Sequence, residues 1–116
     1  MLSRKGLNMS DEFKISLAQL NATVGDLSGN TQKVMEAWEI ARDQRSDLIA
    51  FPELFITGYN PQDLILKTAF QKAATSSIDQ IAKACAQGPA IAIGGPFYDE
   101  NKLYNSYYIL ADGKIQ

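Results

Sequence analysis

The sequence predicts an α/β fold built on a mixed β-sheet. Two short and almost wholly apolar segments, at residues 47–51 and 90–93, have the composition of strands that are covered on both faces. Segments with apolar residues at helical spacing lie before and between them. Strand–helix–strand order implies right-handed crossovers and parallel pairing, and the short turn between the last two predicted strands suits an antiparallel hairpin.

Length and composition limit the classes of protein to which the chain can belong. With 116 residues it is one small domain at most, and 46% hydrophobic and 21% charged residues argue against wholesale disorder. A net charge of −2 argues against a nucleic-acid or membrane-surface binder, because both need clustered positive charge. Histidine is absent and cysteine occurs once, which excludes His-based triads and internal disulfides and fits a reducing, cytoplasmic compartment.

Residues 1–12 are predicted to form a flexible tail before a domain at residues 13–116. The tail is polar, and no apolar stretch follows Arg4 and Lys5 as a secretory signal requires. No apolar run approaches the roughly 18 residues that a membrane span needs.

The first predicted strand spans residues 13–20, where apolar and polar side chains begin by alternating. A helix is predicted over residues 28–45, with its N-cap oxygen supplied by Asp26, Ser28 or Asn30. The apolar face of that helix consists of Val34, Ala37, Trp38 and Ala41.

The strand at residues 47–51 is predicted to end at Pro52, which cannot donate to a β-ladder. A second amphipathic helix is predicted over residues 70–86, with a break possible at the polar cluster of residues 75–77. Its apolar face consists of Phe70, Ala74, Ile78, Ile81 and Cys85.

The last part of the domain is predicted to be a hairpin. A buried strand at residues 90–93 ends in Gly94-Gly95-Pro96, a turn follows at residues 99–102, and a strand covers residues 103–111. Another turn begins at residue 112.

Glu53 is the strongest candidate for a catalytic group. It directly follows the buried strand and Pro52, and ligands of open α/β sheets bind at the carboxyl ends of strands. Apolar neighbours on both sides are expected to desolvate the carboxylate partly and to raise its pKa toward the range of a general base. The structural alternative is a glutamate that caps a backbone amide or points into solvent.

Four other residues are weighed for a role at a site. Tyr59 is expected either to line a substrate pocket or to pack as an aromatic residue that closes the sheet end. Asn105 either supports Glu53 by hydrogen bonding or is an ordinary polar strand residue. Gly94 and Gly95 lack the continuation of a phosphate-binding loop, so we expect them to permit a close backbone approach or a turn.

Cys85, Lys102 and Lys114 are expected to have no catalytic role. Cys85 shares the apolar face of the second helix near its C-terminus, which disfavours a thiolate, so it is predicted to be a core residue. Both lysines fall in predicted turns, where an exposed side chain is the usual outcome.

The motif FPELFITGY at residues 51–59 closely resembles the glutamate signature of the nitrilase (carbon–nitrogen hydrolase) superfamily. The resemblance extends from Lys14 through IAIGGPF and LYNSYYILADGKI. Within the superfamily, QLNATVGDLSGN and FPELFITGYNPQDL look most like the glutaminase domains of glutamine-dependent NAD synthetases. The resemblance implies the N-terminal half of an α-β-β-α sandwich, that is, a mixed sheet with two helices on one face.

The resemblance also implies a Glu–Lys–Cys triad that hydrolyses glutamine. The cysteine attacks the amide carbon, ammonia leaves, and water hydrolyses the resulting thioester, while the glutamate serves as general base and the lysine stabilises the oxyanion. Only Glu53 matches a triad position in this sequence, so the 116-residue chain alone is expected to be inactive.

The implied parent enzyme passes the ammonia to a separate synthetase domain, which uses ATP and Mg²⁺ to amidate nicotinic acid adenine dinucleotide. Such a parent is expected to be a cytoplasmic homo-oligomer with glutamine as its small-molecule substrate. The chain itself is expected to bind no cofactor, metal, nucleic acid or membrane.

Two other interpretations stay open: a superfamily amidase or carbamoylase without a synthetase domain, and a non-catalytic α/β interaction module with a vestigial motif. The isolated chain is expected to aggregate or oligomerise, because an unfinished sheet exposes edges and apolar faces.

Overall fold

The computed structural model of the chain describes residues 12–59, 61, 64, 66–100 and 102–116. The described elements are, in order, β1 (Ile15–Leu17), α1 (Leu27–Asp43), β2 (Leu48–Ala50), α2 (Thr68–Ala84), β3 (Ala90–Asp99), β4 (Lys102–Ala111) and β5 (Lys114–Ile115). Residues 1–11 of the predicted tail lie outside the described residues, and Glu12 is exposed and belongs to no helix or strand. Neither described helix is long and apolar enough to cross a membrane.

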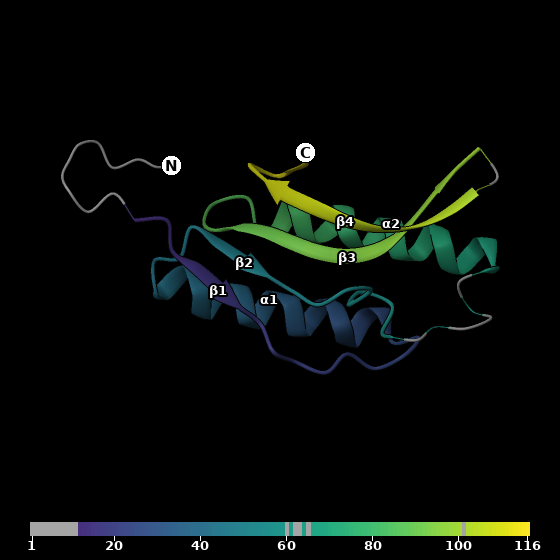
Figure 1. The fold of residues 1–116 in the computed structure, drawn as a ribbon, viewed down its shortest axis with the longest axis horizontal. Coiled ribbons are helices and arrows are strands. Elements are labelled where there is room, and N and C mark those ends of the chain that lie inside the picture. Colours follow the sequence, from purple (N-terminus) through teal and green to yellow (C-terminus); the bar gives the residue numbers. More distant parts are fainter. Residues whose placement is uncertain (1–11, 60, 62–63, 65, 101) are drawn as a thin grey trace.

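The described strands form one mixed sheet in the order β1-β2-β3-β4-β5 (Figure 1). β1, β2 and β3 pair in parallel, whereas β3 with β4 and β4 with β5 pair antiparallel. Both helices lie behind the sheet in Figure 1 and contact each other, so they cover the same face. The predicted mixed sheet with two helices on one face is confirmed.

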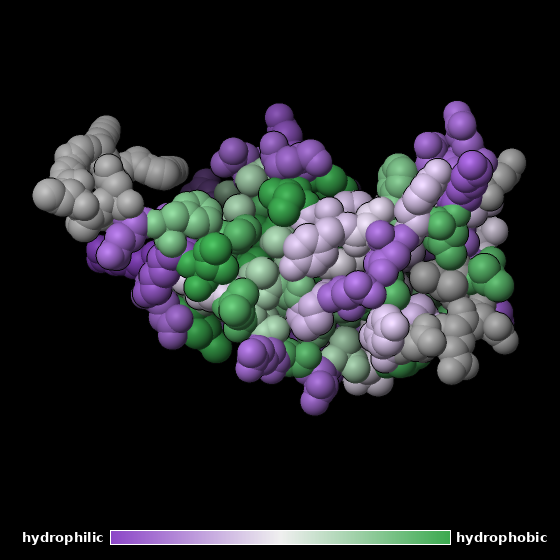
Figure 2. Space-filling model, in the orientation of Figure 1, coloured by the Kyte–Doolittle hydropathy of each residue, from purple (hydrophilic) through white to green (hydrophobic). Residues whose placement is uncertain are grey.

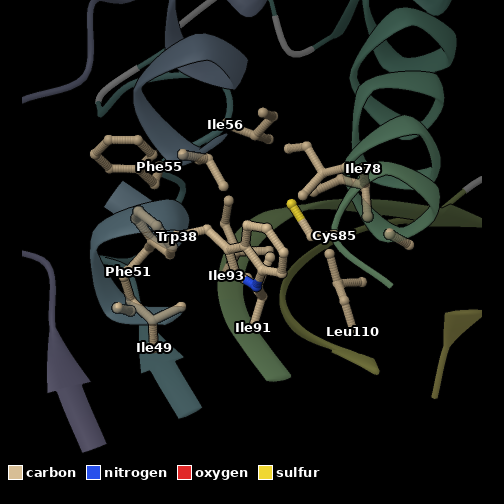
Figure 3. Packing of buried hydrophobic residues seen from close by; sticks show 14 residues of the cluster. Trp38, Ile49, Phe51, Phe55, Ile56, Ile78, Cys85, Ile91, Ile93 and Leu110 are labelled. Atoms are coloured by element: carbon tan, nitrogen blue, oxygen red, sulfur yellow. The ribbon is translucent and has the colours of Figure 1, made fainter. Parts of the chain in front are cut away.

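The core lies between the sheet and these two helices (Figure 3). Most of the residues predicted from helical spacing to face the core are buried there: Val34, Trp38, Ala41, Ala74, Ile78, Ile81 and Cys85. The indole nitrogen of Trp38 donates to the Pro89 carbonyl (2.9 Å), which ties α1 to the connection between α2 and β3. The sheet contributes Ile49, Ile91, Ile93 and Leu110 to the same cluster.

The opposite face of the sheet is open. Side chains that alternate away from the helices are exposed there, among them Ile15 (51% exposed), Leu17 (71%) and Ile109 (41%). Figure 2 looks onto this face and shows hydrophobic groups gathered over β1 and the adjoining sheet. An exposed apolar sheet face of this kind favours association, and the self-association of the isolated chain stays a prediction.

The largest departures from the predicted strand lengths are in β3, which is longer, and β1, which is shorter. β3 continues past residue 93 to Asp99, because every residue from Gly94 to Asp99 keeps a partner on β4, ending with the pair Asp99 and Lys102. β1 has three residues rather than eight, because β2 offers only three partners before Pro52 takes the chain out of the sheet.

The C-terminal turn and the second helix also depart from the prediction. The chain after residue 112 returns as the short strand β5, which the sequence did not indicate. α2 is unbroken across residues 75–77, and the hydroxyl of Thr75 donates to the Gln71 carbonyl one turn earlier (3.0 Å). The hydroxyl is thereby satisfied inside the helix instead of competing with it.

Candidate active site

Glu53 lies in a tight loop that leaves β2. Pro52 has no N–H to continue the ladder, and the loop then folds back on itself: the amide of Phe55 donates to the Pro52 carbonyl and the amide of Thr57 to the Leu54 carbonyl, both at 3.2 Å. Leu54 has a φ of +53°, a left-handed conformation that is unusual for a branched side chain. Glu53 is therefore fixed between a proline and a residue with a strained backbone.

β3 passes directly beneath this loop at Gly94. A Cβ on Gly94 would lie 2.8 Å from the Cα of Glu53, a contact that real Cβ atoms do not make. The amide of Ile56 donates to the Gly94 carbonyl (3.3 Å), which closes the loop onto the strand. The close backbone approach predicted for the two glycines is confirmed at Gly94, and the predicted turn out of the strand is wrong.

Asn30 ties the loop to α1. Its side chain is fully buried, its amide group donates to the carbonyls of Thr23 (2.8 Å) and Ile56 (3.0 Å), and its oxygen accepts from the amide of Thr23 (2.8 Å). Of the three predicted N-cap residues, Asp26 is the cap, since it accepts from the amide of Gly29 (3.0 Å). The Asn30 side chain therefore connects the loops that contain Thr23 and Ile56, and it does not cap the helix.

An open pocket of about 400 Å³ lies beside Glu53. Phe51, Pro52 and Glu53 line it from the loop, and Asn105, Ser106 and Tyr107 line it from β4. The hydroxyl of Tyr107 donates to the Phe51 carbonyl (2.6 Å) and so joins the two sides. The pocket lies at the carboxyl end of β2, where open α/β sheets bind their ligands.

The carboxylate of Glu53 is exposed, and the predicted desolvation by its neighbours is wrong. Phe51 and Phe55 belong to the core between sheet and helices, where Figure 3 shows them and where their ring centroids are 5.3 Å apart. Leu54 is buried as well. Because all three apolar side chains are buried while Glu53 lines the pocket, they leave its carboxylate open to the pocket.

The structure places Asn105 and Tyr59 differently relative to Glu53. Asn105 lines the pocket together with Glu53. Tyr59 is 68% exposed, so its interpretation as a packed aromatic is wrong, and within the described residues it is not among those that line the pocket. A role of Tyr59 toward substrate stays a prediction.

Cys85 is a core residue, as predicted. It is the C-cap of α2 and is 6% exposed. Burial raises the pKa of its thiol to about 11; Glu39 raises the pKa further and Arg42 opposes this. Lys102 and Lys114 are exposed, and neither of them lines the pocket beside Glu53.

Sequence reasoning missed two residues that hold the site, Asn30 and Tyr107. The sequence indicates Asn30 only as a candidate N-cap, because the Ile56 carbonyl to which its amide donates lies 26 residues away along the chain. Tyr107 faces Gly94 across the β3–β4 pair, a register that the sequence alone does not specify.

Comparisons with known proteins place the chain in a family. A carbon-nitrogen hydrolase family model matches residues 14–115. The glutamine-dependent NAD(+) synthetase of Rhodobacter capsulatus is 48% identical over 107 residues, which are 92% of this chain and 19% of that protein. The synthetase of the same name from Thermotoga maritima is 36% identical over 103 residues, 89% of this chain and 18% of that protein.

Solved structures agree with the sequence relatives. A glutamine-dependent NAD(+) synthetase from Cytophaga hutchinsonii superposes with a TM-score of 0.84 at 27% identity, over 90% of this chain and 18% of that one. An amidase from Nesterenkonia sp. superposes with a TM-score of 0.76 at 22% identity, over 97% of this chain and 44% of that one, and shares the fold. The chain spans about a fifth of the length of the synthetases that it matches. The resemblance seen in the Glu53 motif is confirmed: the chain belongs to the carbon-nitrogen hydrolase family.

Proposed function

We propose that this chain is the first part of the amide-hydrolysing domain of a glutamine-dependent NAD(+) synthetase, and that Glu53 is the general base of that domain. The observation that carries the proposal is the position of Glu53. Glu53 follows β2 on a loop whose backbone packs closely against Gly94, and it lines an open pocket. The 48% identity to a synthetase of that name supports the choice of glutamine as the amide.

In the proposed reaction, Glu53 accepts the thiol proton of a cysteine as the sulfur attacks the amide carbon of glutamine, and the proton then goes to the departing ammonia. Water then attacks the thioester carbon, Glu53 takes the proton of the water and returns it to the departing cysteine sulfur, and glutamate is released. A lysine stabilises the oxyanion. Both of these partners would come from sequence outside these 116 residues, since Cys85 is buried with a raised pKa and no described lysine, Lys102 and Lys114 included, lines the pocket. The chain by itself is therefore proposed to be inactive.

The remaining features of the parent enzyme belong to the same proposal. The ammonia would be used by a synthetase domain that binds ATP and Mg²⁺ and amidates nicotinic acid adenine dinucleotide, in a homo-oligomer in the cytoplasm. A cytoplasmic location agrees with a single, buried, unpaired cysteine, which needs no oxidising compartment.

The test is the amide specificity of the full-length protein that carries this sequence. We expect steady-state release of ammonia from glutamine, and NAD formation when ATP, Mg²⁺ and nicotinic acid adenine dinucleotide are added. Hydrolysis of other small amides or carbamoyl compounds without NAD formation would replace the proposal by a simple amidase. Absence of any amide hydrolysis would favour a non-catalytic module.

A further inference from the structure

Two neighbouring tyrosines of β4 make equivalent hydrogen bonds on opposite faces of the sheet. The hydroxyl of Tyr107 donates to the Phe51 carbonyl and that of Tyr108 to the Pro96 carbonyl, both at 2.6 Å. Tyr108 packs against the core on the helix side. Tyr107 is 52% exposed and lines the pocket beside Glu53. Because successive side chains of a strand point to opposite faces, only one of these two bonds can serve the pocket.

The bond of Tyr107 crosses a whole strand. Tyr107 pairs with Gly94 of β3, whereas its acceptor Phe51 follows β2, which lies on the other side of β3. The side chain therefore reaches across β3 at the position where Gly94 has no side chain to block it. Gly94 also leaves room for the backbone of Glu53. The Tyr107 side chain and the Glu53 loop therefore both depend on the missing side chain at Gly94.

The Phe51 carbonyl is the last backbone group before Glu53 that is bonded to a described residue outside the loop, since the Pro52 carbonyl accepts from Phe55 within the loop. The amide of Phe51 is held by the Ala92 carbonyl (2.8 Å), and its carbonyl is held by Tyr107. Pro52, the next residue, has no N–H with which to make an anchor of its own. Burial raises the pKa of Tyr107 above its usual value, so the hydroxyl keeps its proton and acts as the donor throughout the neutral range.

We propose that Tyr107 is a positioning residue for Glu53: its hydroxyl clamps the Phe51–Pro52 peptide and thereby sets the place of the carboxylate two residues later. The inference rests on the proposed role of Glu53 as general base. Since a displacement of about 1 Å in a catalytic group can cost on the order of 100-fold in rate, a lost anchor two residues away should appear in kcat.

The experiment compares Tyr107→Phe with Tyr108→Phe in the full-length protein. Each variant loses one hydroxyl and one 2.6 Å bond to a carbonyl on the same strand, so the second is a matched control. For Tyr107→Phe we expect kcat of glutamine hydrolysis to fall about tenfold with KM changed less than twofold. NAD formation from added ammonium should stay at the wild-type rate. Tyr108→Phe should keep the wild-type kcat and KM, because its bond lies on the helix face.

The Glu53→Gln variant, measured in the same assays, distinguishes failure of the Tyr107 positioning role from failure of the proposed function. Suppose that Glu53→Gln abolishes glutamine hydrolysis while Tyr107→Phe keeps the wild-type kcat or lowers kcat no more than Tyr108→Phe does. The positioning role is then overturned and the proposed function stands. If Glu53→Gln hydrolyses glutamine normally, the proposed function fails and the positioning role fails with it. If Tyr107→Phe lowers ammonium-dependent synthesis equally, its effect is structural and the inference is again overturned.

Discussion

An ideal Cβ on Gly94 would lie 2.3 Å from the backbone nitrogen of Leu54, less than the sum of the van der Waals radii by a wide margin. The loop that carries Glu53 and the strand β3 therefore touch through backbone alone at this point. No other residue type fits there without moving either the strand or the loop.

Gly94→Ala is expected to displace the Glu53 loop. The contact is with backbone atoms, which cannot turn aside as a flexible side chain can, so overpacking should cost about 1–3 kcal/mol and at least tenfold in glutamine hydrolysis. Gly95→Ala is the control, because its Cβ would meet only side chains, the closest being Ile56 at 3.1 Å. Thermal unfolding and kcat of the full-length variants measure both effects; equal losses in the two variants would contradict this account.

Asn30→Ala is expected to destabilise the protein by about 2–4 kcal/mol, because it removes three hydrogen bonds and leaves the buried Ile56 carbonyl without its partner. The neighbouring Thr31→Val is the control. Among the described residues the buried hydroxyl of Thr31 has no hydrogen-bond partner, so its loss should be neutral or stabilising by about 1 kcal/mol. Denaturant unfolding checks the difference, and a Thr31→Val variant as unstable as Asn30→Ala would refute the assignment.

Cys85 is expected to resist alkylation in the native protein. Its thiol is buried and has a pKa of about 11, so the reactive thiolate is scarce at pH 8. Mass spectrometry of peptides after iodoacetamide treatment should find Cys85 modified only after denaturation. Ready labelling of Cys85 in folded protein would show that it is not a core residue.

The same raised pKa predicts a loss of stability at alkaline pH. The folded chain holds the proton of Cys85 more tightly than the unfolded chain does, since the pKa rises from 9.0 to about 11. The stability that depends on Cys85 staying protonated is fully present below pH 9 and is lost as the pH rises toward 11. Cys85→Ala should flatten this part of the stability profile, and an unchanged slope would contradict the prediction.

The isolated chain is expected to self-associate through the open sheet face. Ile15 and Leu17 expose apolar surface there, next to the unpaired edge of β1. Sedimentation velocity should detect oligomers or aggregates, and Leu17→Lys should reduce them. A monodisperse monomer of the unaltered chain would be the contrary result.

The sequence predicted the helices better than the strands, for physical reasons. Helical spacing is local, so the buried positions Val34, Trp38 and Ile78 could be identified from neighbours along the chain. The length of a strand depends on its partners. β3 runs through Gly94 and Pro96 because β4 pairs with it to the end, which no local pattern in residues 90–99 indicates.

The residues of the site also differ in whether the sequence could predict them. Glu53 could be found from its motif and from its position after a buried strand. Asn30 and Tyr107 act on its loop from 26 and 56 residues away along the chain, through bonds to Ile56 and Phe51. The sequence does not indicate the exposure of Glu53, because its neighbours along the chain, Phe51 and Phe55, lie in the core and do not cover the carboxylate.

The role of Glu53 is tested most directly by Glu53→Gln in the full-length protein, with NAD formation measured from glutamine and, separately, from added ammonium. We predict that the glutamine-dependent rate falls by about 10²–10⁴ while the ammonium-dependent rate is unchanged, because under the proposed function only ammonia production uses the carboxylate. Glu36→Gln, which alters an exposed carboxylate on α1 outside the pocket, should leave both rates unchanged. A Glu53→Gln enzyme that uses glutamine at the wild-type rate, or that loses both activities equally, would contradict the central claim.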